Sequence, residues 1–169
     1  MTNPIELSAQ SFRGISLLSC FTAPQLQQMI SLGHTRDFEP YTNIIVEGEE
    51  SWSLFVILEG VVGIFKSNKL TGDIHDVAQL QAGSFFGEMS LVDRNPRSAS
   101  ARAITHCRVF EISRADFESF LNQSHELRLN FYENCVNTLI GRLRELDDNY
   151  VVSQYQLWKT ALRQKGVNP

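Results

Sequence analysis

A short segment in the middle of the chain combines glycine, aromatic, acidic and hydroxyl residues in a pattern that suits anion binding. Gly83 and Gly87 bracket the pair Phe85-Phe86, and a short amphipathic run starts at Glu88. A glycine at the start of a helical turn lets the backbone come close to a ligand, and the free N–H groups of that turn favour a negative charge. The segment therefore predicts a backbone cradle for an anionic group.

Three side chains near this cradle add complementary chemistry. Glu88 would repel a phosphate, but its carboxylate suits accepting hydrogen bonds from sugar hydroxyls. After a turn at residues 93–96, Arg97 offers a planar donor fork that matches phosphate oxygens, and the hydroxyl of Ser98 can add one more hydrogen bond. The combination fits a phosphate fused to a sugar, which is what a cyclic nucleotide presents.

The same segment closely resembles the phosphate-binding cassette of the cyclic-nucleotide-binding family. The pattern of that cassette is Phe-Gly-Glu, a small apolar helix, a short loop, then Pro-Arg, a small residue and Ala. The similarity extends over roughly residues 10–146. It implies that Glu88 binds the ribose 2′-hydroxyl and Arg97 the cyclic phosphate, with Ser98 and the backbone of the short helical turn completing the phosphate nest. The implied ligand-binding residues are Phe86, Gly87, Glu88, Met89, Ser90, Arg97, Ser98 and Ala99.

Members of the family often close the base side of the pocket with residues of the long C-terminal helix. By comparison with a bacterial transcription factor of the family, that stretch falls near Thr138, Arg142 and Leu143, although the residue types differ. Thr138 and Arg142 are therefore the candidate base contacts. Only residues 151–169 follow the long helix, too few for a helix-turn-helix domain, so no DNA binding is expected. Cyclic AMP is the expected ligand; Ser98 could also assist guanine recognition, so cyclic GMP stays open.

Simpler explanations exist for several of these residues. Glu88 and Arg97 could form a structural ion pair on a loop, although the complete cassette argues against this. Phe85 and Phe86 are expected in the core rather than stacked on a base. The four histidines lack the spacing of a metal site, and no Ser/His/Asp or Cys/His grouping indicates catalysis. We therefore expect neither a metal cofactor nor an enzyme.

The regions around the cassette predict a mainly β fold with flanking helices. Residues 1–37 are expected to be a helical segment, with one helix capped by Thr22 and ended by Gly33. From residue 38 to 112, short β-like runs alternate with turn glycines, which indicates an antiparallel β-roll or jelly roll that forms the nucleotide-binding core. Residues 113–150 predict a hinge helix and a long C-terminal helix of the same domain, followed by a helical tail at 151–169.

The long helix carries two apolar stripes. Phe131 and Cys135 form a short one, expected to pack on the roll. The longer stripe, here called the seam, has the alternating three-and-four spacing of a coiled coil. It packs either against the tail or against a second copy; the homodimer is favoured because an exposed apolar stripe of this length is a liability. The tail is out of the heptad frame, so the helix either stutters there or folds back. The seam consists of Leu129, Tyr132, Val136, Leu139, Leu143, Leu146 and Tyr150.

Composition narrows the class of protein further. Hydrophobic residues make up 43% of the chain, which is enough for a core, and the net charge of -4 gives no broad footprint for nucleic acid or anionic membrane. No apolar run approaches the ~18 residues of a membrane span. Three distant cysteines suit neither a disulfide framework nor a zinc site, so a reduced, cytoplasmic protein is expected.

Together these features predict a stand-alone cyclic-nucleotide sensor that relays ligand binding through its C-terminal helices to a protein effector. The alternative is a scaffold of the same fold that dimerises without a ligand.

Overall fold

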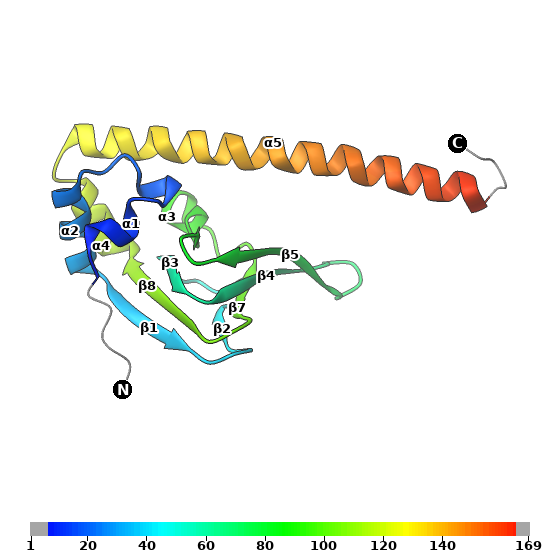
Figure 1. The fold of residues 1–169 in the computed structure, drawn as a ribbon, viewed down its shortest axis with the longest axis horizontal. Coiled ribbons are helices and arrows are strands. Elements are labelled where there is room, and N and C mark those ends of the chain that lie inside the picture. Colours follow the sequence, from blue (N-terminus) through cyan, green and yellow to red (C-terminus); the bar gives the residue numbers. More distant parts are fainter. Residues whose placement is uncertain (1–6, 165–169) are drawn as a thin grey trace.

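The computed structural model describes residues 7–164 and shows two packed antiparallel sheets with helices at one side (Figure 1). The strand orders are β1-β8-β3-β6 and β2-β7-β4-β5. This arrangement confirms the predicted antiparallel β-roll with flanking helices. The strands are β1 (His34–Phe38), β2 (Asn43–Ile45), β3 (Ser53–Glu59), β4 (Val61–Ser67), β5 (Ile74–Gln81), β6 (Phe85–Phe86), β7 (Ser100–Ala103) and β8 (Cys107–Ser113).

Strand β3 divides the hydrophobic interior into two cores. It lies between β8 and β6, and its side chains alternate between the two faces of the sheet. Leu54 and Val56 join a core shared with the helices, whereas Phe55 and Ile57 join a core inside the roll. The helix-side core therefore meets the roll across a single sheet, and a change on one face of β3 is close to the other.

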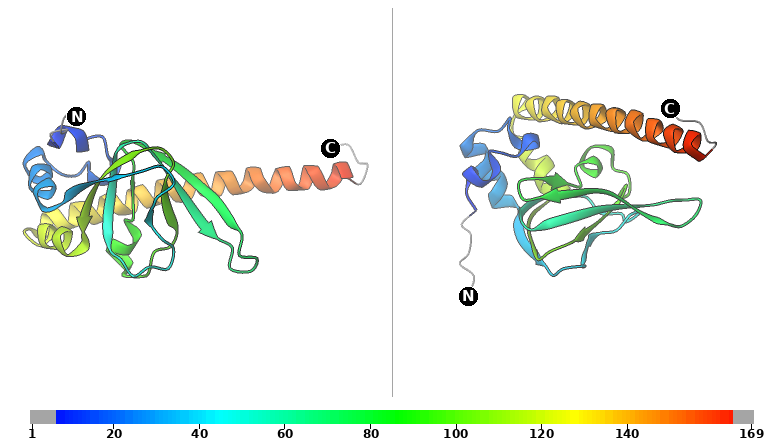
Figure 2. Two further views of the ribbon diagram at one scale, coloured as in Figure 1. Left: turned by 90° about the horizontal axis from the view of Figure 1, so that it is seen from below. Right: turned by 45° about the vertical axis from the view of Figure 1, so that its right-hand side comes forward.

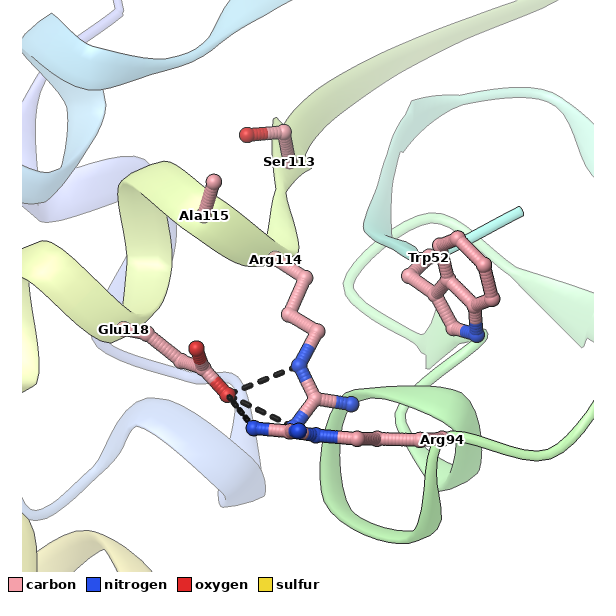
Figure 3. A pocket seen from close by; sticks show the side chains of 6 residues that line it. All are labelled: Trp52, Arg94, Ser113, Arg114, Ala115 and Glu118. Carbon is pink, nitrogen blue, oxygen red and sulfur yellow. Dashed lines mark hydrogen bonds and ion pairs between the residues drawn. The ribbon is translucent and has the colours of Figure 1, made fainter.

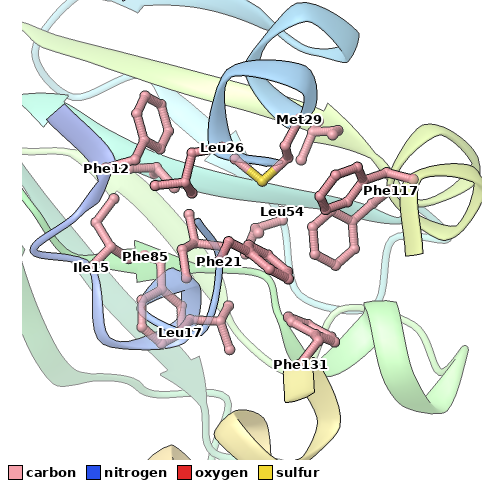
Figure 4. Close-up of a cluster of buried hydrophobic side chains, with 14 of the residues drawn as sticks. Phe12, Ile15, Leu17, Phe21, Leu26, Met29, Leu54, Phe85, Phe117 and Phe131 are labelled. Carbon is pink, nitrogen blue, oxygen red and sulfur yellow. The ribbon is translucent and has the colours of Figure 1, made fainter. Parts of the chain in front are cut away.

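The helix-side core is built from the N-terminal helices and the helices after the roll (Figure 4). Phe117 and Phe131 meet edge to face at 4.9 Å, and Phe21 lies parallel to Phe131. Aromatic pairs of this kind contribute beyond simple burial. The helical elements are α1 (Ala9–Phe12), η1 (Ser16–Leu18), α2 (Ala23–Leu32), α3 (Met89–Asp93), α4 (Arg114–Leu121) and α5 (His125–Gln164).

The N-terminal segment is helical for less of its length than the sequence predicts. Helix α2 starts at Thr22 as expected, with the backbone N–H of Thr22 donating to the Gln25 side chain at 2.8 Å. It ends before Gly33, where a β-carbon would lie 2.3 Å from the Phe110 ring. Strand β1 then begins at His34, so the expectation of helix through residue 37 was wrong. Residues 1–6 of that segment lie outside the described residues.

Helix α5 is continuous over 40 residues, about 60 Å at the rise of an α-helix. Ser124 caps its start by accepting a hydrogen bond from the backbone of Leu127. The helix runs past the roll and projects beyond it (Figure 2). The tail therefore extends the helix and does not fold back, as far as Gln164; residues 165–169 lie outside the described part of the chain.

The two stripes of α5 have different surroundings. Phe131 and Cys135 are buried in the helix-side core, as predicted. The side chain of Asn134, the residue before Cys135, donates to the backbone carbonyl of Leu17 at 2.8 Å and so links α5 to η1. All seven seam residues are exposed in the single chain. Packing of the seam against the tail within one chain is therefore excluded through Gln164.

Candidate functional site

The cassette backbone changes direction at Gly87, between strand β6 and helix α3. Gly87 has φ +82°, a conformation that favours glycine, and a β-carbon there would lie 2.6 Å from the carbonyl oxygen of Ser53. The chain then enters the five-residue helix α3 and leaves it through Arg94, which is left-handed with φ 58°. Both turns fold the segment back on itself, which brings Arg97 beneath the first turn of α3.

Arg97 is the most enclosed charged group of the site, with 4% of the residue exposed. Its Nε donates to the Ser51 hydroxyl at 2.9 Å. Its Nη1 donates to the Ser90 hydroxyl at 2.8 Å and to the carbonyl oxygens of Ser53 and Gly87 at 3.1 and 3.3 Å. The guanidinium group is thus held in one orientation by uncharged oxygens of the roll and the cassette.

One nitrogen of Arg97 has no partner. Its Nη2 is buried and makes no hydrogen bond to any of the residues that the structure describes. Burial lowers the pKa of Arg97, while Glu111, Glu49 and Glu88 oppose that shift; arginine nevertheless keeps its proton in proteins. A buried cation with free N–H donors is costly unless a negative group joins it. Nη2 is therefore the one group of the Arg97 guanidinium whose donors are left to pair with an anion.

Glu88 is paired with the long helix rather than with Arg97. Its carboxylate forms an ion pair and hydrogen bond with Nη1 of Arg142, and the side chains are 13% and 43% exposed respectively. The Arg142 guanidinium also lies over the Phe85 ring, 4.6 Å from its centre. The structure thus brings the predicted ribose ligand, Glu88, together with one of the two predicted base contacts.

The remaining predicted residues occupy three kinds of position. Phe86 is buried and stacks on Phe55 at 5.0 Å, so the expectation that the aromatic pair belongs to the core is confirmed. Ser90 is buried beneath the cassette, whereas Met89 and Ser98 are exposed at its rim and Ala99 is half-buried. Thr138 is half-buried on α5, one turn before Arg142. Its role as a base contact stays a prediction.

Three contributors to the site were missed from the sequence. Ser51 and Ser53 hold Arg97, and Lys66 of β4 donates to the backbone carbonyl of Ser98 at 2.8 Å. They lie at least 30 residues from their partners in the chain, as the separations of 32, 44 and 46 show. No local pattern marks them, since they meet the cassette only through the pairing of β3 with β6 and of β4 with β7.

No group of three His, Cys, Asp or Glu side chains within residues 7–164 is placed to hold a metal ion. Cys20, Cys107 and Cys135 are all free thiols. Over the same stretch, none of the helices has the length and apolar character that crossing a membrane requires.

Comparisons with known proteins identify the family. The family model for the cyclic nucleotide-binding domain matches residues 35–124. The Homo sapiens potassium/sodium hyperpolarization-activated cyclic nucleotide-gated channel 4 is 37% identical over 95 residues, which is 56% of this chain and 7% of the channel. The chain thus spans only a small part of that relative.

Solved structures agree in fold. The catabolite activator protein of Thermus thermophilus matches with a TM-score of 0.70 and 26% identity, covering 83% of this chain and 63% of that one. A cyclic nucleotide-binding domain from Methylobacillus flagellatus matches with a TM-score of 0.75 and 24% identity, covering 86% and 85%. The likeness in sequence, fold and cassette leads to one conclusion: this chain belongs to the cyclic nucleotide-binding domain family.

Proposed function

We propose that this protein binds a 3′,5′-cyclic nucleotide in the cassette. The observation that carries the proposal is the unpaired Nη2 of Arg97, buried beside the Gly87 turn. In the complex, Arg97 and the backbone N–H groups at the start of α3 hold the cyclic phosphate. Glu88 accepts a hydrogen bond from the ribose 2′-hydroxyl. Arg97 lies within the same hydrogen-bond cluster as Ser90 and Gly87, so phosphate binding orders the cassette as a unit.

Cyclic AMP is the proposed ligand, with cyclic GMP as the competing one. The exposed Ser98 hydroxyl lies 3.6 Å from the Met89 sulfur, a weak contact that leaves it available to a ligand. A serine at this position suits either base, so a direct comparison of the two nucleotides decides between them. The protein acts as a binding module and not as an enzyme, and it works in the reduced environment of the cytoplasm.

The relay to the helices runs through Glu88. In the structure, Arg142 of α5 holds the carboxylate that the ribose would need. A ribose hydroxyl and the Arg142 guanidinium compete for Glu88, so nucleotide binding loosens a contact between the cassette and α5. A ligand shifts an equilibrium only through such a difference in contacts between two states. The shifted helix then presents a different surface to a protein effector.

The seam supports a homodimer through α5. It covers three heptads, and every one of its residues is exposed in the single chain. The docked stripe of Phe131 and Cys135 points into the helix-side core, so the seam stays available beside the roll. A second copy of α5 supplies the same apolar stripe and covers the exposed residues of both chains.

Calorimetric titration tests the binding proposal. The protein is titrated with cyclic AMP, cyclic GMP and, as a matched control, 5′-AMP, which has the same base and sugar but an open phosphate. We expect saturable binding of cyclic AMP, weaker binding of cyclic GMP and at least tenfold weaker binding of 5′-AMP. Absence of binding by both cyclic nucleotides would overturn the proposal and favour the alternative, a dimerising scaffold that needs no ligand.

A further inference from the structure

Ser90 of the cassette lies between two arginines that approach from opposite sides. Its hydroxyl accepts from Arg97 at 2.8 Å and donates to the Gly87 carbonyl at 3.1 Å. Its backbone carbonyl accepts from Nη1 of Arg114 at 3.1 Å. Ser90 itself is buried. One residue of α3 thus joins the phosphate-side arginine to the first residue of α4.

Arg114 is held at its backbone by Trp52 and at its guanidinium group by Glu118; Figure 3 shows the contacts with Glu118. Its backbone N–H donates to the Trp52 carbonyl at 2.8 Å. Its guanidinium group makes two contacts with one carboxylate oxygen of Glu118, at 2.7 Å from Nε and 2.6 Å from Nη2. The side chain is only 14% exposed. An ordinary exposed pair four residues apart on a helix contributes little, but this one also aims Nη1 at the cassette.

The second end of α3 reaches the same carboxylate. Arg94, the left-handed residue that ends α3, places its Nη2 3.9 Å from Glu118 Oε1. Helix α3 is therefore held to α4 at its first turn through Ser90 and at its last through Arg94. The residues of this contact line a cavity of about 440 Å³ that also includes Trp52. A shift of α3 must either move α4 or break these bonds.

Helix α4 passes such a movement on to α5. Its buried residues Phe117, Phe120 and Leu121 belong to the helix-side core, and Phe117 packs on Phe131 of α5. Close-packed elements of this kind move together because gaps between them are costly. The route from the cassette to α5 through α4 is thus continuous and independent of the Glu88–Arg142 pair.

We propose that Arg114 is a positioning residue that couples the phosphate-binding helix α3 to the hinge helix α4, through Ser90 and Glu118. This rests on the proposed function for its ligand, but the clamp itself is made by residues of this chain alone. Arg114 touches no nucleotide in this scheme. It sets how far a change at the cassette reaches the helices.

Hydrogen exchange of the whole chain tests the clamp without any ligand. Arg114→Met keeps an unbranched apolar stem and removes the donors, and Glu118→Gln keeps the shape and removes the charge. The matched control is Arg108→Met, because Arg108 is 17% exposed and pairs with Asp37 at 2.9 Å on the far end of β8. We expect exchange in α3 to become at least fivefold faster in Arg114→Met, less so in Glu118→Gln, and unchanged in the control.

A second arm adds cyclic AMP. In the wild type the nucleotide is expected to change exchange in α3, α4 and the start of α5. In Arg114→Met it should still change α3, with affinity reduced less than fivefold, while its effect on α4 falls by at least half. Arg114→Lys should restore part of the coupling. An unaltered effect on α4, or unchanged exchange of α3 without ligand, would overturn the coupling role. If the wild type binds no nucleotide, the proposed function fails instead, while the ligand-free arm still decides the clamp.

Discussion

Two of the arginines at the cassette, Arg97 and Arg142, contact it in opposite ways. Arg97 comes from the loop of the cassette itself, is almost fully buried, and uses two of its nitrogens on fixed oxygens while keeping the third free. Arg142 comes from α5, is 43% exposed, and contacts one carboxylate and one ring face. The first arrangement is preorganised for one anion, whereas the second can exchange its partner at low cost.

The same contrast separates the two parts of α5. Its first turns are locked by buried Phe131 and Cys135 and by the Asn134 bond to η1. From Val136 onward, beyond buried Cys135, the apolar residues of the seam are exposed, and the far end of the helix projects past the roll (Figure 2). The helix thus has a docked end with buried side chains and a free end with an exposed apolar stripe. In the proposed function, the docked end follows the cassette and the free end forms the dimer.

The largest expected effect tests the free end of α5. Leu139→Asp with Leu143→Asp places four carboxylates in the seam of a dimer, where burial of unpaired charges is strongly unfavourable. Sedimentation should show a dimer for the wild type and a monomer for this variant. Both leucines are exposed in the single chain, so circular dichroism should show the roll intact.

The control for the seam changes the opposite face of the helix by the same charge. Asn137→Asp with Arg144→Gln also lowers the net charge by two, but neither residue belongs to the seam. This variant should remain dimeric. A wild type that sediments as a monomer, or a seam variant that stays dimeric, would contradict the coiled-coil interface.

The second prediction concerns Arg97. Removing a charge-assisted hydrogen bond costs roughly 1.5–3 kcal/mol, so Arg97→Ala should weaken cyclic AMP binding by at least about tenfold. Calorimetry measures the affinity, and thermal unfolding without ligand checks the roll, because Arg97 also holds Ser51 and Ser90. Arg102→Ala is the control: Arg102 lies on β7 and bonds Asn43, away from the cassette. Wild-type affinity in a folded Arg97→Ala protein would refute the cassette assignment.

The contrast between the two arginines also explains what the sequence could predict. The cassette can be recognised in the sequence because its glycine turn, acidic residue and arginine follow each other closely in the chain. Ser51 and Ser53, which hold Arg97, cannot be recognised in this way, because strand pairing brings them in from 44 or more residues away. Strand β1 was missed for a related reason: four of its five residues are exposed, so it lacks the alternation that marks a half-buried strand.

The long helix shows the limit of periodicity. The apolar pattern correctly predicted that the short stripe of Phe131 and Cys135 is docked on the domain. It left open whether the tail folds back, because the change of frame after Tyr150 is compatible with either outcome. The continuous helix resolves this through Gln164. No local sequence pattern predicted the ion pair between Arg142 and Glu88, since that contact depends on the angle at which α5 leaves the helix-side core.

The third prediction tests whether the Arg142 contact is exchangeable. Arg142→Met removes the competitor for Glu88, together with the guanidinium contact on the Phe85 ring, and keeps an unbranched apolar stem on α5. Cyclic AMP affinity should therefore rise about twofold to fivefold, in line with the ~0.2–1 kcal/mol of exposed ion pairs. Calorimetry measures this against Arg144→Met, one of the neighbouring arginines on α5. A fall in affinity would contradict competition and would instead support the base contact predicted from the sequence.

The smallest expected effect tests the docked end of α5 through Cys135. Burial raises the pKa of this thiol to about 12, and nearby Cys20 adds to the shift. In the unfolded chain the pKa of a cysteine is about 8.5, so above that pH the unfolded state holds fewer protons than the folded one. The contribution of the raised pKa of Cys135 to the free energy of unfolding is fully present below about pH 8.5. It is lost as the pH rises toward 12.

Thermal unfolding between pH 8 and pH 10 measures this loss. The free energy of unfolding should fall more steeply with pH in the wild type than in Cys135→Ala, by at most ~1.4 kcal/mol per pH unit. Comparing the slopes of the free energy of unfolding against pH removes the pH-independent loss of stability that the smaller side chain causes. Cys135 is the last buried residue among those of α5 whose burial the structure describes, so the slope reports whether the docked end stays packed. The seam variant should show the same slope as the wild type, since Cys135 is buried within a single chain. Equal slopes in wild type and Cys135→Ala would mean that α5 opens at its docked end as readily as at its free one.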